Sequence, residues 1–200
     1  MKQVASYQVE IADPAVALAA VVHARPVDHP CRLTLELAPD PVRDAVLVDY
    51  GLSGVDRQEY VLLASHLQQH PAGNASGEYT GGSDNRIHRR ERQYCLVAGG
   101  SLFAQGVGRS RCLSAAPGFS QASTGYFGSS DLWQDVSQHQ AMTWNFTSAG
   151  PGFVVLGAEF AAASGVVALT FAANPTTAAD LAAQSLAAGI DAARTAVVTA

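Results

Sequence analysis

Apolar and polar residues alternate along most of the chain in short runs that are separated by turn-forming residues. The run from Cys31 to Leu37 alternates cleanly, and Pro39-Asp40-Pro41 ends it. Strict alternation places every second side chain on one face, which is typical of a half-buried β-strand. The same criteria predict further strands at residues 7–11, 18–25, 45–49, 59–64, 93–98, 101–106, 125–128, 142–146, 153–160 and 166–172.

The spacing of these runs predicts the fold class. Strands that recur about every 8–12 residues, with glycine and proline between them, are typical of antiparallel sandwiches and barrels. Helical periodicity is nearly absent before residue 174, and no internal repeat divides the chain. We therefore expect an all-β, antiparallel two-sheet sandwich over residues 1–174.

The last segment of the chain has a different pattern. Asn174-Pro175-Thr176-Thr177 offers helix-capping residues, and residues 178–198 are rich in alanine, a strong helix former. An alanine-rich helix is expected within residues 175–200. Because the helix has few polar side chains, we expect its apolar face to pack on another surface. That surface is either a sheet of this domain or one outside the chain.

Composition excludes several classes of protein. The chain has 200 residues, of which 48% are hydrophobic and 14% charged, so it is not intrinsically disordered. A net charge of −5 makes nucleic acid and anionic membranes poor partners. The uncharged stretch from Phe160 to Ala173 is too short to span a bilayer. We expect neither a nucleic-acid nor a membrane partner.

No motif for a cofactor or a metal is present. The chain lacks a P-loop, a dinucleotide-binding glycine motif and a zinc-protease motif. Its three cysteines, Cys31, Cys95 and Cys112, show no metal-ligand spacing and are expected to be buried free thiols. His66 and His70 stand four residues apart but follow a predicted strand, so a surface role is favoured over a shared metal.

The densest group of candidate functional residues lies between residues 119 and 135, in FSQASTGYFGSSDLWQD. Aromatic rings beside carboxylates and amides suit sugar recognition, because a ring stacks on the apolar face of a pyranose while polar groups bind its hydroxyls. The binding candidates are Tyr126, Asp131, Trp133, Gln134, Asp135 and the nearby Trp144.

Two other interpretations apply to the same residues. In the structural one, Trp133 fills the core while Asp131 and Asp135 fix a tight turn through backbone hydrogen bonds. In the catalytic one, the two carboxylates form a hydrolytic pair, which requires a separation of about 5–10 Å and opposite protonation roles. Nothing in the sequence raises the pKa of one carboxylate selectively, so no catalytic residue is assigned.

The 119–135 segment also carries a family resemblance. Together with Met142-x-Trp144 and GFVVLGAE at residues 152–159, it is similar to the N-terminal domain of bacterial glucoamylases and glucodextranases, the family 15 glycoside hydrolases. This resemblance implies a β-supersandwich related in fold to galactose mutarotase. It also implies a non-catalytic accessory domain that docks on an (α/α)6 catalytic barrel, with Trp133 in a turn at the rim and residues 175–200 as the helical linker or docking segment.

The chain departs from that family pattern in two respects. Leu132 stands where the family usually has glycine, which predicts an altered turn. The family's opening strands and its catalytic barrel are expected to be absent, which leaves an exposed sheet edge. A homodimer through that edge is one way to satisfy its backbone groups.

Two alternatives to the accessory domain come from other functional classes. The first is a free-standing carbohydrate-binding module that binds α-glucan oligosaccharides through the aromatic turn. The second is a sugar epimerase of the mutarotase type, which uses a histidine and a carboxylate as acid and base. His66, His88 and His139 are its candidates, and the sequence identifies no partner for them.

Overall fold

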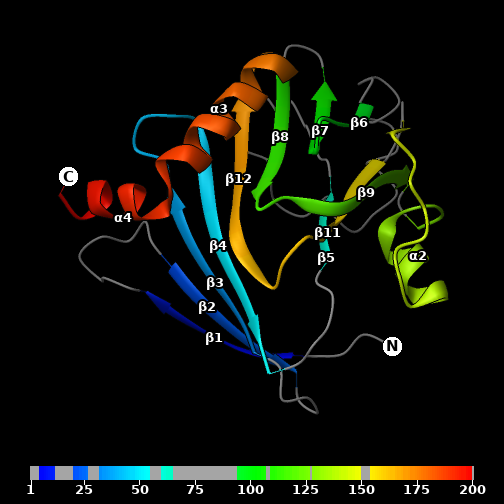
Figure 1. Cartoon of the computed structure of the whole chain (residues 1–200), viewed down its shortest axis with the longest axis horizontal. Helices are drawn as coiled ribbons and strands as arrows, with labels where there is room; N and C mark the ends of the chain where they lie inside the picture. Colours follow the sequence, from blue (N-terminus) through cyan, green and yellow to red (C-terminus); the bar gives the residue numbers. More distant parts are fainter. Residues whose placement is uncertain are drawn as a thin grey trace, which may run out of the picture.

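The computed structural model describes residues 5–11, 20–26, 32–54, 60–64, 94–106, 109–126, 128–149 and 154–199. Most of the described regular structure is antiparallel β-sheet arranged in two sheets, with helices at the C-terminal end, so the predicted fold class is confirmed (Figure 1). The strands are β1 (Ala5–Ile11), β2 (Ala20–Pro26), β3 (Arg32–Pro39), β4 (Ala45–Ser53), β5 (Tyr60–Ala64), β6 (Tyr94–Ala98), β7 (Ser101–Gly106), β8 (Arg109–Ala116), β9 (Phe119–Tyr126), β10 (Ser148–Ala149), β11 (Val154–Phe160) and β12 (Ser164–Ala172). The helices are α2 (Leu132–His139), α3 (Pro175–Ala188) and α4 (Ile190–Thr199).

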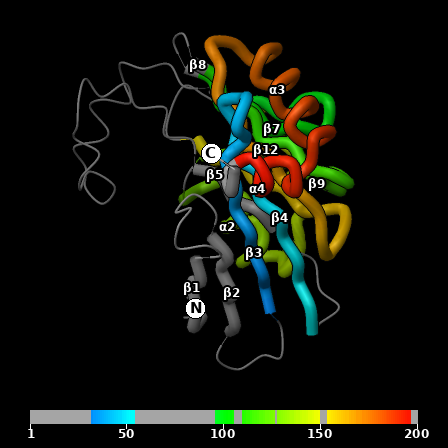
Figure 2. Tube along the Cα trace, turned by 90° about the vertical axis from the view of Figure 1, so that its left-hand side faces the viewer, coloured from blue at the N-terminus to red at the C-terminus, as the bar shows by residue number. Residues whose placement is uncertain are grey.

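The strands form two sheets. A nine-stranded sheet has the order β1-β2-β3-β4-β12-β8-β7-β6-β10, and a three-stranded sheet has the order β5-β11-β9. In the large sheet, β3 and β4 pair along their whole length and run side by side in Figure 2. The last strand, β12, lies between β4 and β8. It therefore joins the strands β1–β4 to the strands β6–β8 within one sheet.

Each face of the large sheet has its own core, and the alternation along the strands decides which side chains enter it. Leu113 on β8 and Val167 on β12 face the small sheet, where they pack with Val154 and Leu156 of β11. Their neighbours Cys112 and Ala168 face the opposite side and pack beneath α3 and α4. The period of two seen in the sequence is therefore the physical basis of the layered structure.

Helix α3 covers the outer face of the large sheet (Figure 1). It begins at Asn174, whose side chain accepts a hydrogen bond from the Thr177 backbone N–H at 2.9 Å. Ala178, Ala182 and Ser185 form its buried face. Small side chains at this spacing let the helix approach the sheet closely, and the alanine-rich composition is thereby explained.

Two polar contacts fix α3 to the sheet. The Thr170 hydroxyl of β12 donates to the Ala178 carbonyl at 2.7 Å, and the Ser185 hydroxyl donates to Asp40 Oδ2 at 2.7 Å. Burial raises the pKa of Asp40, but hydrogen bonds from Val42, Ser185 and Arg43 outweigh it and hold that pKa below its ordinary value. The sequence left open whether the helix packs on a sheet of this domain or on a surface outside the chain, and α3 packs on the sheet. The linker or docking role of residues 175–200 stays a prediction.

The structure corrects several local predictions. Residues 142–146 form no strand, a helix (α2) replaces the tight turn expected at 131–135, and the C-terminal segment is two helices divided at Gly189. Strand β8 was not predicted because the side chains that it buries under α3 include Ser110 and Cys112, which hide the alternation. Residues Cys31, His66, His70 and His88 lie outside the described residues, as does the side chain of Cys95.

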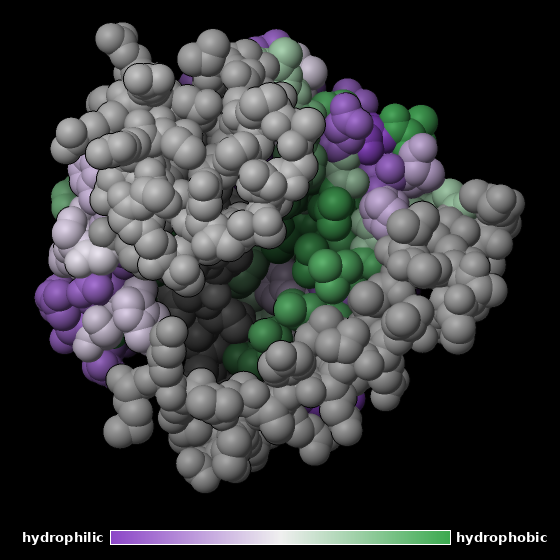
Figure 3. Space-filling view, turned by 180° about the vertical axis from the view of Figure 1, so that it is seen from behind, coloured by the Kyte–Doolittle hydropathy of each residue, from purple (hydrophilic) through white to green (hydrophobic). Residues whose placement is uncertain are grey.

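One segment links the free edges of the two sheets. In this crossing segment, residues 141–149, the Phe146 carbonyl accepts a hydrogen bond from the Thr124 backbone N–H of β9 at 2.9 Å. The next carbonyl, that of Thr147, accepts one from Val97 of β6 at 2.8 Å, and β10 then pairs with β6. In the view from behind, described apolar side chains lie side by side near the middle of the molecule (Figure 3).

Helix α2 packs on the small sheet at a glycine. A Cβ atom added to Gly157 of β11 would lie only 2.4 Å from the Cβ of Leu132, the first residue of α2. Such a distance is far inside van der Waals contact, so the sequence V-L-G-A of β11 needs its glycine to accept Leu132. Leu132 itself is buried, with 5% of its surface exposed.

We expect Gly157→Ala to lower the free energy of unfolding by about 1–3 kcal/mol, because the added methyl overpacks against Leu132. Leu132→Gly removes the clashing atoms, so the double variant should lose less stability than the sum of the two single variants, by about 1 kcal/mol or more. Urea denaturation of the four proteins measures this coupling. Gly51→Ala is the matched control, since an added Cβ there meets nothing within 4 Å. Strictly additive effects would contradict the contact.

Candidate functional site

The predicted binding residues gather around α2, and the structure divides them into buried carboxylates and exposed rings. Asp131 and Asp135 are buried, with 3% and 1% of their surface exposed. Trp133 and Tyr126 are 55% and 43% exposed. Trp133 therefore does not fill the core, and the structural interpretation of that residue is wrong.

Asp131 starts the helix. Its Oδ1 accepts a hydrogen bond from the Gln134 backbone N–H at 3.0 Å, and its Oδ2 accepts one from the Gly128 N–H. An aspartate at the N-cap satisfies amide groups that the first turn of a helix leaves free, and it suits the positive end of the helix dipole. The structural role that the sequence suggested for Asp131 is therefore present, in a helix rather than in a turn.

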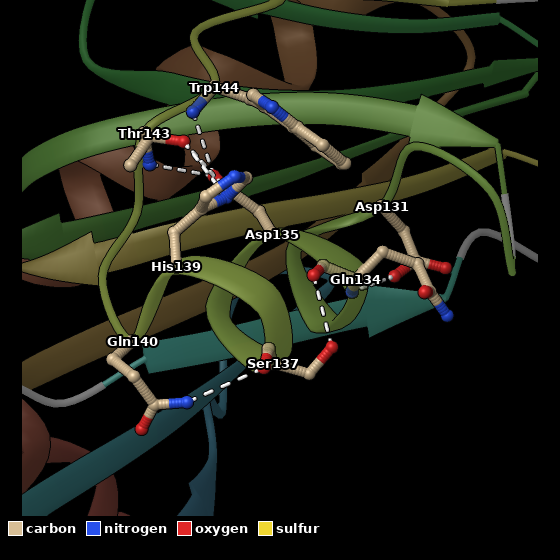
Figure 4. A network of polar contacts seen from close by, with 8 residues as sticks. All are labelled: Asp131, Gln134, Asp135, Ser137, His139, Gln140, Thr143 and Trp144. Carbon is tan, nitrogen blue, oxygen red and sulfur yellow. Dashed lines mark hydrogen bonds and ion pairs between the residues drawn. The ribbon is translucent and has the colours of Figure 1, made fainter.

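Asp135 connects α2 to the crossing segment (Figure 4). Its Oδ2 accepts hydrogen bonds from the backbone N–H groups of Thr143 and Trp144, both at 2.7 Å. Its Oδ1 accepts the Thr143 hydroxyl at 2.6 Å and lies 2.8 Å from His139 Nδ1. Burial raises the pKa of Asp135, but these bonds from Thr143, Trp144 and His139 together hold the pKa below its ordinary value.

The remaining binding candidates are Gln134, Trp144 and Tyr126. Gln134 is partly buried, and its carbonyl accepts the Ser137 hydroxyl at 3.0 Å. Trp144 is partly buried and its ring meets those of His139 and Phe146, each at a centroid distance of 6.0 Å. Tyr126 closes β9 at the other end of the site, and its backbone N–H donates to the Ser130 hydroxyl.

Sequence reasoning missed Thr143 and Phe146 as members of this site, and it named His139 only as an epimerase candidate without a partner, whereas the structure places His139 beside Asp135. The signal for His139 was its position four residues after Asp135, which brings two side chains together on a helix. That spacing carries meaning only once the segment is known to be helical. With only eight residues, α2 is too short for its three apolar positions, Leu132, Trp133 and Val136, to be recognised as a helix from the sequence.

The arrangement is a scaffold that anchors exposed rings. Both carboxylates accept hydrogen bonds from backbone N–H groups, which ties them to local structure. Within the described part of the chain, no group of three or more histidine, cysteine or acidic residues is arranged to hold a metal ion. Over the same described residues, no helix is long and apolar enough to cross a membrane.

We expect Asp135→Asn to lower the free energy of unfolding by about 2–4 kcal/mol, because an amide cannot accept all the donors that surround this carboxylate. Chemical denaturation measures the loss. Asp180→Asn is the matched control, since Asp180 is exposed on α3 and its replacement should change stability by less than about 0.5 kcal/mol. An equal effect of both substitutions would contradict the role of Asp135.

The contribution of Asp135 should also depend on pH in a defined direction. Its pKa in the folded protein lies below the ordinary value of 3.8, so the stabilisation is complete well above pH 3.8 and is lost as the pH falls through the lowered value. The difference in unfolding free energy between the wild type and Asp135→Asn should therefore be largest near neutral pH and shrink below about pH 4. A difference that grows in acid would contradict this assignment.

Comparison with known proteins adds an independent line of observation. No curated protein matches the sequence. Among solved structures, the fold is similar to the crystal structure of a bacterial glucoamylase complexed with acarbose, with a TM-score of 0.79 and 17% sequence identity. The similarity covers 98% of this chain and 28% of the glucoamylase chain, so the protein spans less than a third of that enzyme's length.

A family of sequences matches nearly the entire chain. The match covers residues 1–199, and the family is described as "Glucodextranase, domain N". It includes the strands of both sheets, the α2 site and the two C-terminal helices. The protein therefore belongs to the glucodextranase N-terminal domain family.

Proposed function

We propose that this protein is the non-catalytic accessory domain of an α-glucan hydrolase of the glucoamylase or glucodextranase type, and that it docks on the catalytic (α/α)6 barrel of that enzyme. The observation that carries the proposal is the family match over residues 1–199. The similarity to only 28% of a glucoamylase chain is consistent with a domain that works beside a larger catalytic part.

The chemistry of the site supports a non-catalytic role. A general acid in glycoside hydrolysis needs a carboxyl group whose pKa is raised, so that it holds a proton at neutral pH. The pKa of Asp135 is lowered instead, and its oxygens are occupied by backbone and hydroxyl donors. Asp131 is occupied by the first turn of α2. These carboxylates support structure and do not form an acid–base pair.

Helix α2 is the surface that we propose for docking. Trp133 lies in its first turn with 55% of its surface exposed, and Tyr126 at the end of β9 is 43% exposed. Asp131, Asp135 and the Gly157 contact fix the helix on the small sheet, so little further order is lost when the rings are covered. Exposed tryptophan and tyrosine on a rigid support are typical of the residues that dominate interfaces.

The test uses the purified chain and a separately produced glucodextranase-type catalytic barrel, with binding measured by isothermal titration calorimetry. We expect association that Trp133→Ala weakens by about 30-fold, the effect of losing roughly 2 kcal/mol at an interface hot spot. Phe171→Ala is the matched control, because Phe171 is another exposed ring, 38% exposed on β12. The proposal fails if the barrel does not bind, or if both substitutions act equally.

A carbohydrate-binding module is the second candidate, and the exposure of Trp133 and Tyr126 favours it. In that case the rings stack on α-glucan oligosaccharides directly.

The epimerase alternative and the homodimer through a sheet edge stay predictions. Mutarotation of glucose by the purified chain tests the first of these, and sedimentation velocity tests the second.

We expect direct sugar binding at Trp133 to give a saturable change in tryptophan fluorescence on titration with maltooligosaccharides or isomaltooligosaccharides. The chain has two tryptophans, Trp133 and Trp144, so the change must be assigned by substitution. A change abolished in Trp133→Ala places the sugar on the first turn of α2. A change that persists in this variant excludes Trp133 as the sugar contact.

A further inference from the structure

Three rings form a row beyond the C-terminal end of α2. His139 is the last residue of the helix, and its ring meets the edge of Trp144 at a centroid distance of 6.0 Å and an interplanar angle of 72°. Phe146 continues the row, 6.0 Å from Trp144. The His139 side chain is 42% exposed and Phe146 is 48% exposed, so the row is open to solvent.

The backbone that carries these rings is held by buried polar groups. Asp135 accepts the Trp144 backbone N–H, and the hydroxyl of Ser123, which is 4% exposed, accepts the Phe146 N–H at 3.0 Å. The Phe146 carbonyl in turn accepts the N–H of Thr124 on β9. The row is therefore pre-organised before any ligand arrives, which lowers the entropic cost of binding.

His139 has a defined hydrogen-bonding state in this arrangement. Its Nδ1 faces the ionised Asp135 at 2.8 Å, and a carboxylate can only accept, so the proton of the neutral ring is on Nδ1. In the neutral ring the other nitrogen, Nε2, is then an acceptor, and the His139 side chain is 42% exposed. Figure 4 shows the imidazole of His139 beside Asp135, with Trp144 close to it.

The segment that carries the row has no formally charged residue. From residue 136 to residue 158 the sequence contains no aspartate, glutamate, lysine or arginine. The exposed neighbours of the row are amides and hydroxyls, among them Gln138, Asn145 and Thr147. A charged ligand or an acidic or basic peptide finds no counter-charge on this segment, whereas a neutral molecule with many hydroxyls finds both apolar rings and uncharged polar partners there.

We propose that His139, Trp144 and Phe146 form a subsite for one pyranose ring of a neutral α-glucan. The sugar's apolar C–H face lies on the Trp144 and Phe146 rings, and one sugar hydroxyl donates to His139 Nε2. Asp135 is the positioning residue that orients the imidazole and holds residues 143–144. The choice of an α-glucan rests on the proposed function, while the neutral polyhydroxy class rests on the surface itself.

The test uses the full chain with Trp133→Phe, which leaves Trp144 as its single tryptophan. We expect a saturable fluorescence change on titration with maltohexaose or isomaltohexaose, together with a shift of the His139 imidazole signals in NMR spectra. His139→Ala and Phe146→Ala, added to this background, should each weaken binding by 10-fold or more. Phe171→Ala is the matched control and should leave it unchanged, and circular dichroism checks that every variant is folded.

His139→Gln provides a second check, because its amide restores a polar partner without the imidazole and should recover part of the affinity lost in His139→Ala. No saturable change up to 10 mM sugar, or a change that Phe171→Ala reduces as much as Phe146→Ala does, overturns the subsite. Binding of the catalytic barrel, measured on the chain that keeps Trp133, separates the two failures. A chain that binds the barrel and not the sugar overturns this inference alone, whereas a chain that binds only the sugar overturns the docking proposal.

Discussion

The buried carboxylate of Asp135 is the interaction on which the candidate site of this domain depends. Its two oxygens gather the backbone of residues 143 and 144, the Thr143 hydroxyl and the His139 ring. Without these bonds the crossing segment would have no fixed relation to α2. The same segment joins β9 of the small sheet to β6 of the large one, so the carboxylate that orders the site also ties the two sheets at their free edges.

A second constraint is the close steric contact between Leu132 of α2 and Gly157 of β11. Leu132 can enter α2 as a buried residue only because Gly157 leaves room on β11. The family resemblance placed a glycine at position 132 and predicted an altered turn for leucine. In this chain the leucine is an apolar anchor of α2, and the glycine that gives close contact is on the strand.

The sequence predicted the strands well wherever one face of a strand is apolar and the other polar. It failed where burial uses small or polar residues, as at Ser110 of β8 and Ser123 of β9, because such positions do not register as hydrophobic. The candidate site was found by composition, since aromatic and acidic residues crowd residues 119–135. Its division into buried carboxylates and exposed rings was not predictable, because that depends on α2, which is short and held by tertiary contacts more than by its own pattern.

The placement of charge on this face argues for a binding role over a catalytic one. Asp131 and Asp135 point into the structure, where they accept backbone donors, and the side chains left outside on α2 and the crossing segment are uncharged or aromatic. For either carboxylate to act as the acid or base itself, it would have to be free to exchange a proton with a substrate. Here the carboxylates instead stiffen the support, and a rigid, neutral, aromatic surface is suited to contact a partner without reacting with it.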